Sequence, residues 1–435
     1  MPGWPTLCLA ALAMALEIRD GLGAPLAFIA LAVAMCAALS DVVRFRIDRE
    51  MGPIGPALVL LAFGLAPLLH RSLSEHATAF GAEMPWPVRL LPLVTAFVAL
   101  AVIAAKVRPW VLVAVASVAF ASLGLAAIHA VPIPHIDVWW SQNAGIDAFL
   151  QGANPYATSF PDLYNDPSGY ALGIVRNGVV HLGYPYPPVT LLLDAPFRAW
   201  FGDIRFGHVL ATLITAFLIA GRRPTLATAL PAAMFLMIPR QAFAIESAWM
   251  DPWVACLGVA ALRSIPLGIL PFGILTGLFM ASKPSMLAIA PAFLLVGLGW
   301  RKICQSAIVA GVAAACMVLP FRGANPTAFD QSTWRVVSAM PTHPLSLSLP
   351  GWLIAHRGID IGALPGFLAP WVVFFIAIWK RLRGQLGTSI VIATGLLTFF
   401  ALNKFAWCNY YLTVAAFIAF SMACRNESRP SRISA

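Results

Sequence analysis

Apolar stretches of about 20 residues, the length an α-helix needs to cross the hydrocarbon core of a bilayer, recur along most of this 435-residue chain. Hydrophobic residues make up 60% of the sequence and charged residues 11%. Soluble domains carry roughly 45–50% apolar and about 25% charged residues. A water-soluble core cannot bury this excess, so the sequence predicts an all-α, polytopic helical membrane protein.

Thirteen runs have the length and composition of transmembrane helices, with approximate boundaries. They are 24–42, 53–69, 89–105, 109–129, 205–220, 225–240, 251–262, 266–281, 285–300, 303–320, 363–379, 386–402 and 409–423. The run from Trp4 to Leu16 is short, and it predicts either a first short helix or an interfacial segment. No basic region precedes it, so we do not expect a cleaved signal peptide.

Charge sets the predicted orientation. Alternating the thirteen spans places 16 of the 28 Lys and Arg residues on one side with only 4 of the 18 acids, and the positive-inside rule makes that side cytoplasmic. The basic residues form small juxtamembrane groups without the basic and aromatic stripe of a nucleic-acid-binding face, so the net charge of +10 predicts no nucleic-acid partner. The seven cysteines lack metal-ligand spacing, and no metal site is expected.

Two loops on the opposite, extracytoplasmic side are long, 130–187 and 321–362. The first is rich in Trp and Tyr, which argues for a folded cap rather than disorder. The stretch 188–201 is apolar but carries Asp194 and Arg198, and a crossing there would reverse every later charge cluster. We therefore expect an interfacial or re-entrant helix. These features divide the chain into N-terminal transmembrane helices, 1–108, and a core, 109–435, that contains both loops.

Ionisable residues gather at the outer ends of the spans and in the two loops, with His208 as the main exception inside a span. Such residues near the membrane are costly and are candidates for function. Asp137 follows the span ending near His129 and is flanked by aromatic residues, a position that suits a general base acting on a hydroxyl group. The alternative is that Asp137 caps a helix from about Val138 to Leu150.

Three motifs occur in order around the first loop. Asp137-Val-Trp139 comes first, Gly152-Ala-Asn-Pro-Tyr156 follows about fifteen residues later, and Tyr184-Pro-Tyr-Pro-Pro188 opens the next membrane segment. Their order and spacing resemble the first-loop signature of GT-C glycosyltransferases. They look most like glycosyltransferase family 87, which includes polyprenyl-phosphomannose-dependent mannosyltransferases. Weaker similar elements are Ala281-Ser-Lys283-Pro284, Asn403-Lys404 and Asn409-Tyr410-Tyr411, so the resemblance covers most of 109–423.

The resemblance implies a GT-C-like fold and an inverting sugar transfer that needs no metal or other cofactor. The implied donor is a polyprenyl-phosphate sugar, with mannose as one example. The implied acceptor is an extracytoplasmic glycan, lipid or protein, and the implied location is the plasma (inner) membrane. Asp137 would be the general base, and polyprenyl phosphate would leave. Three or four spans precede Asp137 where that family usually has one, and the first loop is long between Tyr156 and Tyr184. Both departures concern which substrate the protein uses rather than the chemistry of the transfer.

A leaving phosphate needs positive charge held in place. The outer-side candidates are Arg240, Lys283, Arg335, His343, Arg357 and Lys404. Each of the Arg and Lys residues has the alternative of snorkelling to lipid phosphates, and His343 has that of capping a turn.

Candidates for contacting the sugar or the acceptor are Asp147, Asn154, Tyr156, Tyr186 and Glu246. The alternatives are a solvated helix face for Asp147, a turn for Asn154 to Tyr156, and stiff extended backbone for the Tyr184–Pro188 run. Asp251 precedes Pro252, and we expect it to cap a helix.

Two other functions compete with sugar transfer from a lipid donor. An outer-face glycan polymerase or ligase would use the same location. A secondary transporter would place ionisable groups and broken helices near the bilayer midplane, often in paired repeats, and the sequence shows neither.

Overall fold

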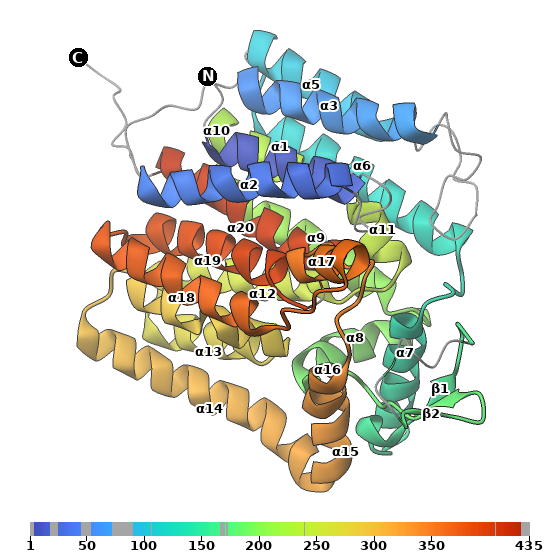
Figure 1. Ribbon diagram of the computed structural model, residues 1–435. Helices are drawn as coiled ribbons and strands as arrows, with labels where there is room; N and C mark the ends of the chain where they lie inside the picture. The colour runs from blue at the N-terminus through green and yellow to red at the C-terminus, as the bar shows by residue number, and fades with distance from the viewer. Residues whose placement is uncertain are drawn as a thin grey trace.

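The computed structural model describes residues 4–17, 25–44, 54–71, 90–105, 107–165, 170, 173–238, 240–404 and 406–427. These residues are mostly helical, and the described strands are three of two residues each (Figure 1). The all-α prediction is therefore confirmed. The charged residues Arg19, Asp20, Arg46, Arg49, Lys106, Arg429 and Arg432, which the predicted topology uses, lie outside the described residues.

A helix coincides with each of the thirteen predicted spans. They are α2 (Pro25–Val43), α3 (Ile54–Arg71), α5 (Leu91–Ala105), α6 (Trp110–Ala130), α9 (Arg205–Ala220), α10 (Leu226–Leu236), α12 (Asp251–Arg263), α13 (Ile269–Met280), the 3₁₀ helix η5 (Pro284–Leu295), α14 (Trp300–Ala324), α18 (Leu364–Trp379), α19 (Gly384–Ala401) and α20 (Cys408–Glu427). The N-terminal run forms α1 (Trp4–Glu17).

Within the described residues, α2, α6, α14 and α19 are long and apolar enough to cross a membrane on length and composition. Eight further apolar helices have 10–17 residues. The chain is a multi-pass membrane protein. Several helices are shorter than the predicted spans. For α13, Gly268, with φ of 110°, precedes the helix, which begins at Ile269 rather than near 266.

The helices run side by side, with α20 inside the bundle and α14 at its edge (Figure 1). Helices α1, α10, α12 and α19 all pack against α20. Helix α14 packs mainly on α13, and the two approach closely at Gly277, where an added Cβ would lie 2.3 Å from the Ala310 carbonyl oxygen. Close approach of backbones at small residues is the usual way for helices to associate in lipid.

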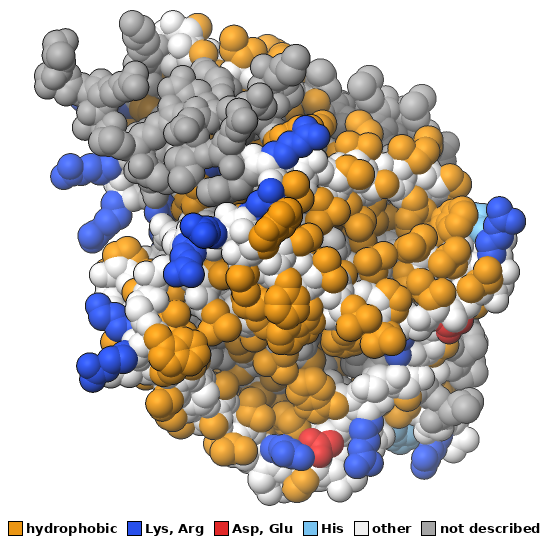
Figure 2. Space-filling model, turned by 60° about the vertical axis from the view of Figure 1, so that its left-hand side comes forward, with side chains coloured by type: hydrophobic (Ala, Val, Ile, Leu, Met, Phe, Trp, Pro, Cys, Tyr) orange, Lys and Arg blue, Asp and Glu red, His pale blue; other side chains and the backbone are white. Residues whose placement is uncertain are grey.

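Hydrophobic side chains cover most of the middle of the face shown in Figure 2, and Lys and Arg lie mostly toward its edges. Large exposed apolar residues on α18 include Phe367, Trp371, Phe375 and Trp379. Ile308, Val312 and Leu319 are exposed on α14. Apolar exposure on this scale is the surface that a bilayer covers.

The first long loop is folded, as predicted. It contains α7 (Asp137–Leu150), the 3₁₀ turn η2 (Pro155–Ala157) and an antiparallel sheet of order β1-β3-β2, and it leads into α8 (Pro188–Phe201). The strands are β1 (Phe160–Pro161), β2 (Val175–Arg176) and β3 (Val179–Val180). Asn177 and Gly178, both with positive φ, join β2 to β3, which is the Asn-Gly pair that a two-residue hairpin favours.

The second long loop packs on the first. Its helices are α15 (Pro326–Asp330), the π-helical turn η6 (Gln331–Arg335), α16 (Val336–Ala339) and α17 (Leu349–Arg357). Val336 is buried with Phe160, Tyr170, Ile174 and Val180 of the first loop. The two loops therefore form one structure, which we call the cap.

Candidate functional site

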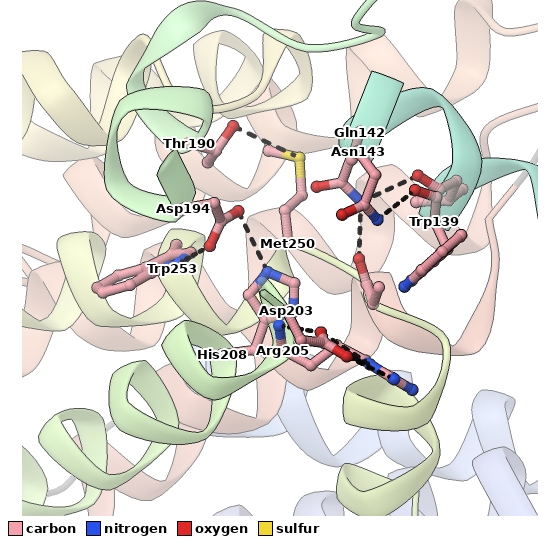
Figure 3. Close-up of polar contacts among 12 residues, drawn as sticks. Trp139, Gln142, Asn143, Thr190, Asp194, Asp203, Arg205, His208, Met250 and Trp253 are labelled. Carbon is pink, nitrogen blue, oxygen red and sulfur yellow. Dashed lines mark hydrogen bonds and ion pairs between the residues drawn. The ribbon is translucent and has the colours of Figure 1, made fainter. Parts of the chain in front are cut away.

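Arg205 of α9 holds the segment that leads into the cap (Figure 3). Its guanidinium group is fully buried and donates hydrogen bonds to the carbonyl oxygens of Val131 at 2.7 Å and Pro132 at 3.1 Å, just past the end of α6. It also donates to the Glu246 carbonyl oxygen at 3.3 Å and pairs with Asp203 at 2.6 Å. These bonds satisfy carbonyl groups that a helix end leaves without intrahelical partners.

Two further contacts fix α7. Gln142 donates from Nε2 to the Ala248 carbonyl oxygen at 2.7 Å, and Ala248 is a buried non-glycine residue with φ of 55°. Asp147 accepts two hydrogen bonds of 2.7 Å from Arg198 of α8. Asp147 is thus part of an ion pair that joins α7 to α8, rather than of a freely solvated helix face.

Asp137 is the first residue of α7, and Ile136, in extended conformation, occupies the N-cap position. The alternative role of Asp137 as a helix cap is therefore not seen; instead Oδ1 accepts the neighbouring Val138 N–H at 2.8 Å. Two tyrosines of the cap bind the carboxylate: the Tyr170 hydroxyl donates to Oδ2 at 3.1 Å, and the Tyr164 hydroxyl donates to Oδ1 at 3.4 Å. The Asp137 side chain stays partly exposed.

Burial raises the pKa of Asp137 above its ordinary value, and the hydrogen bonds from Tyr170, the Val138 N–H and Tyr164 oppose that rise. Protein therefore surrounds the carboxylate, while the residue as a whole keeps part of its surface exposed. Burial and the nearby Asp137 charge also raise the pKa of the Tyr164 and Tyr170 phenols, which keeps both as donors. A carboxylate with a raised pKa is a stronger base than an ordinary aspartate.

A second polar cluster is buried between α12, α13 and α20. Lys283 donates from Nζ to Asp251 Oδ1 at 2.8 Å, Asn409 donates from Nδ2 to Asp251 Oδ2, and Lys283 Nζ lies 3.6 Å from the centre of the Tyr410 ring. Asp251 begins α12 but makes no capping bond, so the expected capping role is wrong. Its carboxylate turns instead to Lys283, 32 residues away in the sequence.

Tyr186 packs against the buried apolar residues of the bundle and also against those around Tyr156 in the cap. Burial, and then Tyr410, Asp251 and Asp137, raise the pKa of its phenol well above the ordinary value. Tyr186 and Tyr410 are partly exposed, like Asp137. We refer to six residues together as the dyad site: Asp137, Tyr186, Asp251, Lys283, Asn409 and Tyr410.

The turn expected at 154–156 is confirmed. Asn154 accepts the Tyr156 N–H at 2.8 Å and caps η2. Tyr156 is buried, its ring centre lies 4.7 Å from that of Phe329, and its hydroxyl donates to the Tyr186 carbonyl oxygen at 3.1 Å. The ring of Tyr156 is thus packed against other side chains inside the cap. Glu246, the last residue of α11 (Gln241–Glu246), is also buried, and its carbonyl oxygen accepts a hydrogen bond from Arg205.

The six cationic candidates do not gather at one place, but His343 and Lys404 are in contact: the His343 N–H donates to the Lys404 carbonyl oxygen at 3.3 Å. Arg240 is buried and donates to the Leu16 carbonyl oxygen at 3.1 Å, while Lys404 donates to the Ser338 and Met340 carbonyl oxygens. His343 accepts the Leu345 N–H at 3.2 Å, which bears out the turn alternative. Arg335 and Arg357 are exposed on η6 and α17. Lys283 alone among the six belongs to the dyad site.

His208, the ionisable residue expected inside a span, is fully buried and lies 3.2 Å from Asp194 of α8 (Figure 3). Trp253 of α12 donates to the other oxygen of Asp194 at 2.7 Å. These contacts tie α8, α9 and α12 together below the cap. In the described parts of the chain, no three His, Cys, Asp or Glu side chains gather as metal ligands.

No protein-family model and no curated protein match this chain. Among solved structures, the chain is similar to ArnT from Cupriavidus metallidurans bound to undecaprenyl phosphate, with a TM-score of 0.45 and 16% identity over 72% of this chain and 60% of that one. The apo state of the same protein gives a TM-score of 0.43 and 15% identity over 68% and 56% of the two chains. The chain thus matches less than two thirds of the length of ArnT.

Proposed function

We propose that this protein is a membrane glycosyltransferase of the GT-C type that moves a sugar from a polyprenyl-phosphate donor to an extracytoplasmic glycan, lipid or protein. The observation that carries the proposal is the environment of Asp137. A partly exposed carboxylate with a raised pKa lies seven residues beyond the end of α6, a helix long and apolar enough to span a membrane. Two phenols donate to it in the way that an incoming hydroxyl group would.

In the proposed reaction, an acceptor hydroxyl replaces a tyrosine hydroxyl at Asp137 and gives its proton to the carboxylate. The acceptor oxygen forms a bond to the anomeric carbon as the bond from that carbon to the phosphate oxygen breaks. The configuration inverts, the polyprenyl phosphate leaves with the electron pair, and the proton remains on Asp137 until water removes it. The burial that raises the pKa of Asp137 favours this transfer.

Arg335 is the cation we place at the leaving phosphate. It is exposed and has no ion pair among the residues that the structure describes, and it is followed by Val336, which packs in the same cluster as Tyr170. Arg240 and Arg357 belong to other elements, before α11 and at the end of α17. Lys404 lies nearer to Arg335, but its ammonium group already donates to the Ser338 and Met340 carbonyl oxygens. The charge of Lys283 is matched by Asp251, which leaves it less able to hold an anion.

The test is a transfer assay on membranes that contain the protein, with labelled monosaccharyl polyprenyl phosphates as donors. The proposal expects label to move to an acceptor fraction only when the protein is present. A requirement for a lipid-linked oligosaccharide donor would favour a polymerase or ligase instead. Sugar uptake by proteoliposomes without any lipid-linked sugar would favour a transporter.

A further inference from the structure

We propose that Gln142 of α7 is a positioning residue for the base Asp137, and that it acts by fastening α7 to the turn between α11 and α12. This turn, residues 246–251, runs from the last residue of α11 to the first residue of α12, and we call it the brace. The proposal rests on the proposed function and adds to it a residue that acts on the base through the helix.

The first turn of α7 carries Asp137 and depends on support from outside the helix. Ile136, whose side chain has no polar atom, holds the N-cap position. The first N–H groups of a helix lack intrahelical partners, and a helix end without a capping side chain frays more readily. The position of the Asp137 carboxylate is therefore set by the contacts that hold α7 against the rest of the protein.

Two buried side chains attach the chain on either side of Asp137 to the brace (Figure 3). Before Asp137, Arg205 donates to a carbonyl oxygen just past the end of α6 at 2.7 Å and to the Glu246 carbonyl oxygen at 3.3 Å. After Asp137, Gln142 donates from Nε2 to the Ala248 carbonyl oxygen at 2.7 Å. Glu246 and Ala248 are two residues apart, so one short turn holds the segment that carries Asp137 at both of its ends.

The brace is itself firmly held. Ala248 is fully buried and has φ of 55°, a left-handed conformation that a residue other than glycine keeps only where the surrounding structure fixes it. At the other end of the brace, the Asp251 carboxylate accepts a hydrogen bond from Lys283 at 2.8 Å and another from Asn409. This buried cluster therefore anchors the brace in the bundle, and Gln142 passes that anchorage on to α7.

The amide of Gln142 is not the side chain that stability alone would favour at this position. Gln142 is 0% exposed, and its Oε1 accepts no hydrogen bond from the residues that the structure describes. A buried polar atom without a partner costs free energy. An apolar side chain of similar length would remove that cost but would also leave the Ala248 carbonyl group without the bond from α7. The two effects on stability oppose each other, whereas only the lost bond affects the position of α7.

Two variants and one control test this role. Gln142→Met keeps the length of the side chain and removes the donor, so we expect little change in Tm. Gln142→Asn keeps an amide but is one methylene shorter, which breaks the bond to Ala248. Asn143→Leu is the matched control, because Asn143 is a neighbouring buried amide whose Nδ2 donates at 2.8 Å to the Trp139 carbonyl oxygen within α7 itself.

The first readout is the transfer assay with the full-length protein. Both Gln142 variants should lower kcat by about 10–100-fold with little change in the KM of the donor, because a displaced base slows proton transfer and leaves donor binding intact. The acidic limb of the pH profile of kcat/KM should also move to higher pH, since a shifted α7 weakens the hydrogen bond that Tyr170 gives to the charged Asp137 carboxylate. A role in stability alone would not move this limb, and Asn143→Leu should keep it in place.

The second readout, amide hydrogen exchange of the purified protein, needs no transfer. Both Gln142 variants should exchange faster than the wild type in the first turns of α7, and Asn143→Leu should not. If the wild type moves no sugar from any donor but this local change is seen, the catalytic proposal fails and the attachment of α7 to the brace stands. Unchanged exchange would overturn the attachment. Wild-type kcat and an unmoved acidic limb in the Gln142 variants, or failure of both to fold, would overturn the positioning role.

Discussion

The Tyr170 hydroxyl donates a hydrogen bond to Asp137 Oδ2 over 3.1 Å, and this contact joins the cap to the first residue of α7. Tyr170 itself is buried in the cluster that the two long loops share. The carboxylate that we propose as the base is therefore held by the packing of the cap, and its basicity depends on that packing.

Replacing Tyr170 with phenylalanine should move the acidic limb of the pH profile of kcat/KM to higher pH. The hydroxyl stabilises the charged carboxylate and so lowers the pKa of Asp137; without it, that pKa rises further, and the active deprotonated form appears only at higher pH. The measurement is transfer rate against pH for both proteins. Tyr411→Phe, which lacks contact with Asp137, should leave the limb in place, and an unmoved limb in Tyr170→Phe would contradict the assigned contact.

Replacing Arg205 with methionine should destabilise the protein by about 3–5 kcal/mol, because the Asp203 carboxylate and the Val131 and Pro132 carbonyl groups lose a buried partner. Thermal unfolding of the detergent-solubilised protein measures the loss. Adding Asp203→Asn should recover part of it.

The contrasting variant is Arg198→Gln. Its ion pair with Asp147 is partly exposed, so we expect a change of about 1 kcal/mol or less. Equal losses in the two arginine variants would show that burial does not set the strength of these contacts.

Replacing Gly277 with valine should separate α13 from α14, since even a Cβ at this position would lie 2.3 Å from the Ala310 carbonyl oxygen. Overpacking of this kind costs about 1–3 kcal/mol. Gly311→Val on α14 is the matched control because an added Cβ there meets no atom within 4 Å. A drop in Tm confined to Gly277→Val is expected, and similar values for both variants would rule out the close packing.

The proposed sidedness predicts which residues an impermeant reagent reaches. In a cysteine-free background, Asn177→Cys at the exposed β2–β3 turn should react in intact cells with a membrane-impermeant maleimide. Arg222→Cys, exposed between α9 and α10, should react only after the membrane is permeabilised. The reverse pattern would place the cap in the cytoplasm and remove the proposed outer-face reaction.

Local patterns in the sequence predicted the helices and the folded cap well, because apolar run length and aromatic content are properties of neighbouring residues. The prediction was also right where a motif is short, as at Asn154, whose side chain reaches only two residues ahead. It failed at Asp251, where a capping rule based on the next residue, Pro252, competes with a partner 32 residues away.

The rest of the site depends on contacts between residues far apart in the sequence. Such contacts leave no pattern among neighbouring residues, so the sequence could not predict them. Arg205 reaches carbonyl groups 73 and 74 residues earlier, and Asn409 reaches Asp251 over 158 residues. Six cations could be named as phosphate ligands from the charge pattern, but only the folded chain tells which are already bound to carbonyl groups. Lys283 was one of these six, and the fold pairs it with Asp251, a carboxylate 32 residues away in the sequence.

The most direct measurement is the turnover of Asp137→Asn with a polyprenyl-phosphate sugar donor. Asparagine keeps the size of the side chain but cannot take a proton, so the account predicts a fall in kcat of about 10²–10⁴-fold with normal expression and Tm. Asp330→Asn, which alters an exposed ion pair on α15, is the control and should keep full turnover. Wild-type turnover by Asp137→Asn would contradict the assignment of Asp137 as the base.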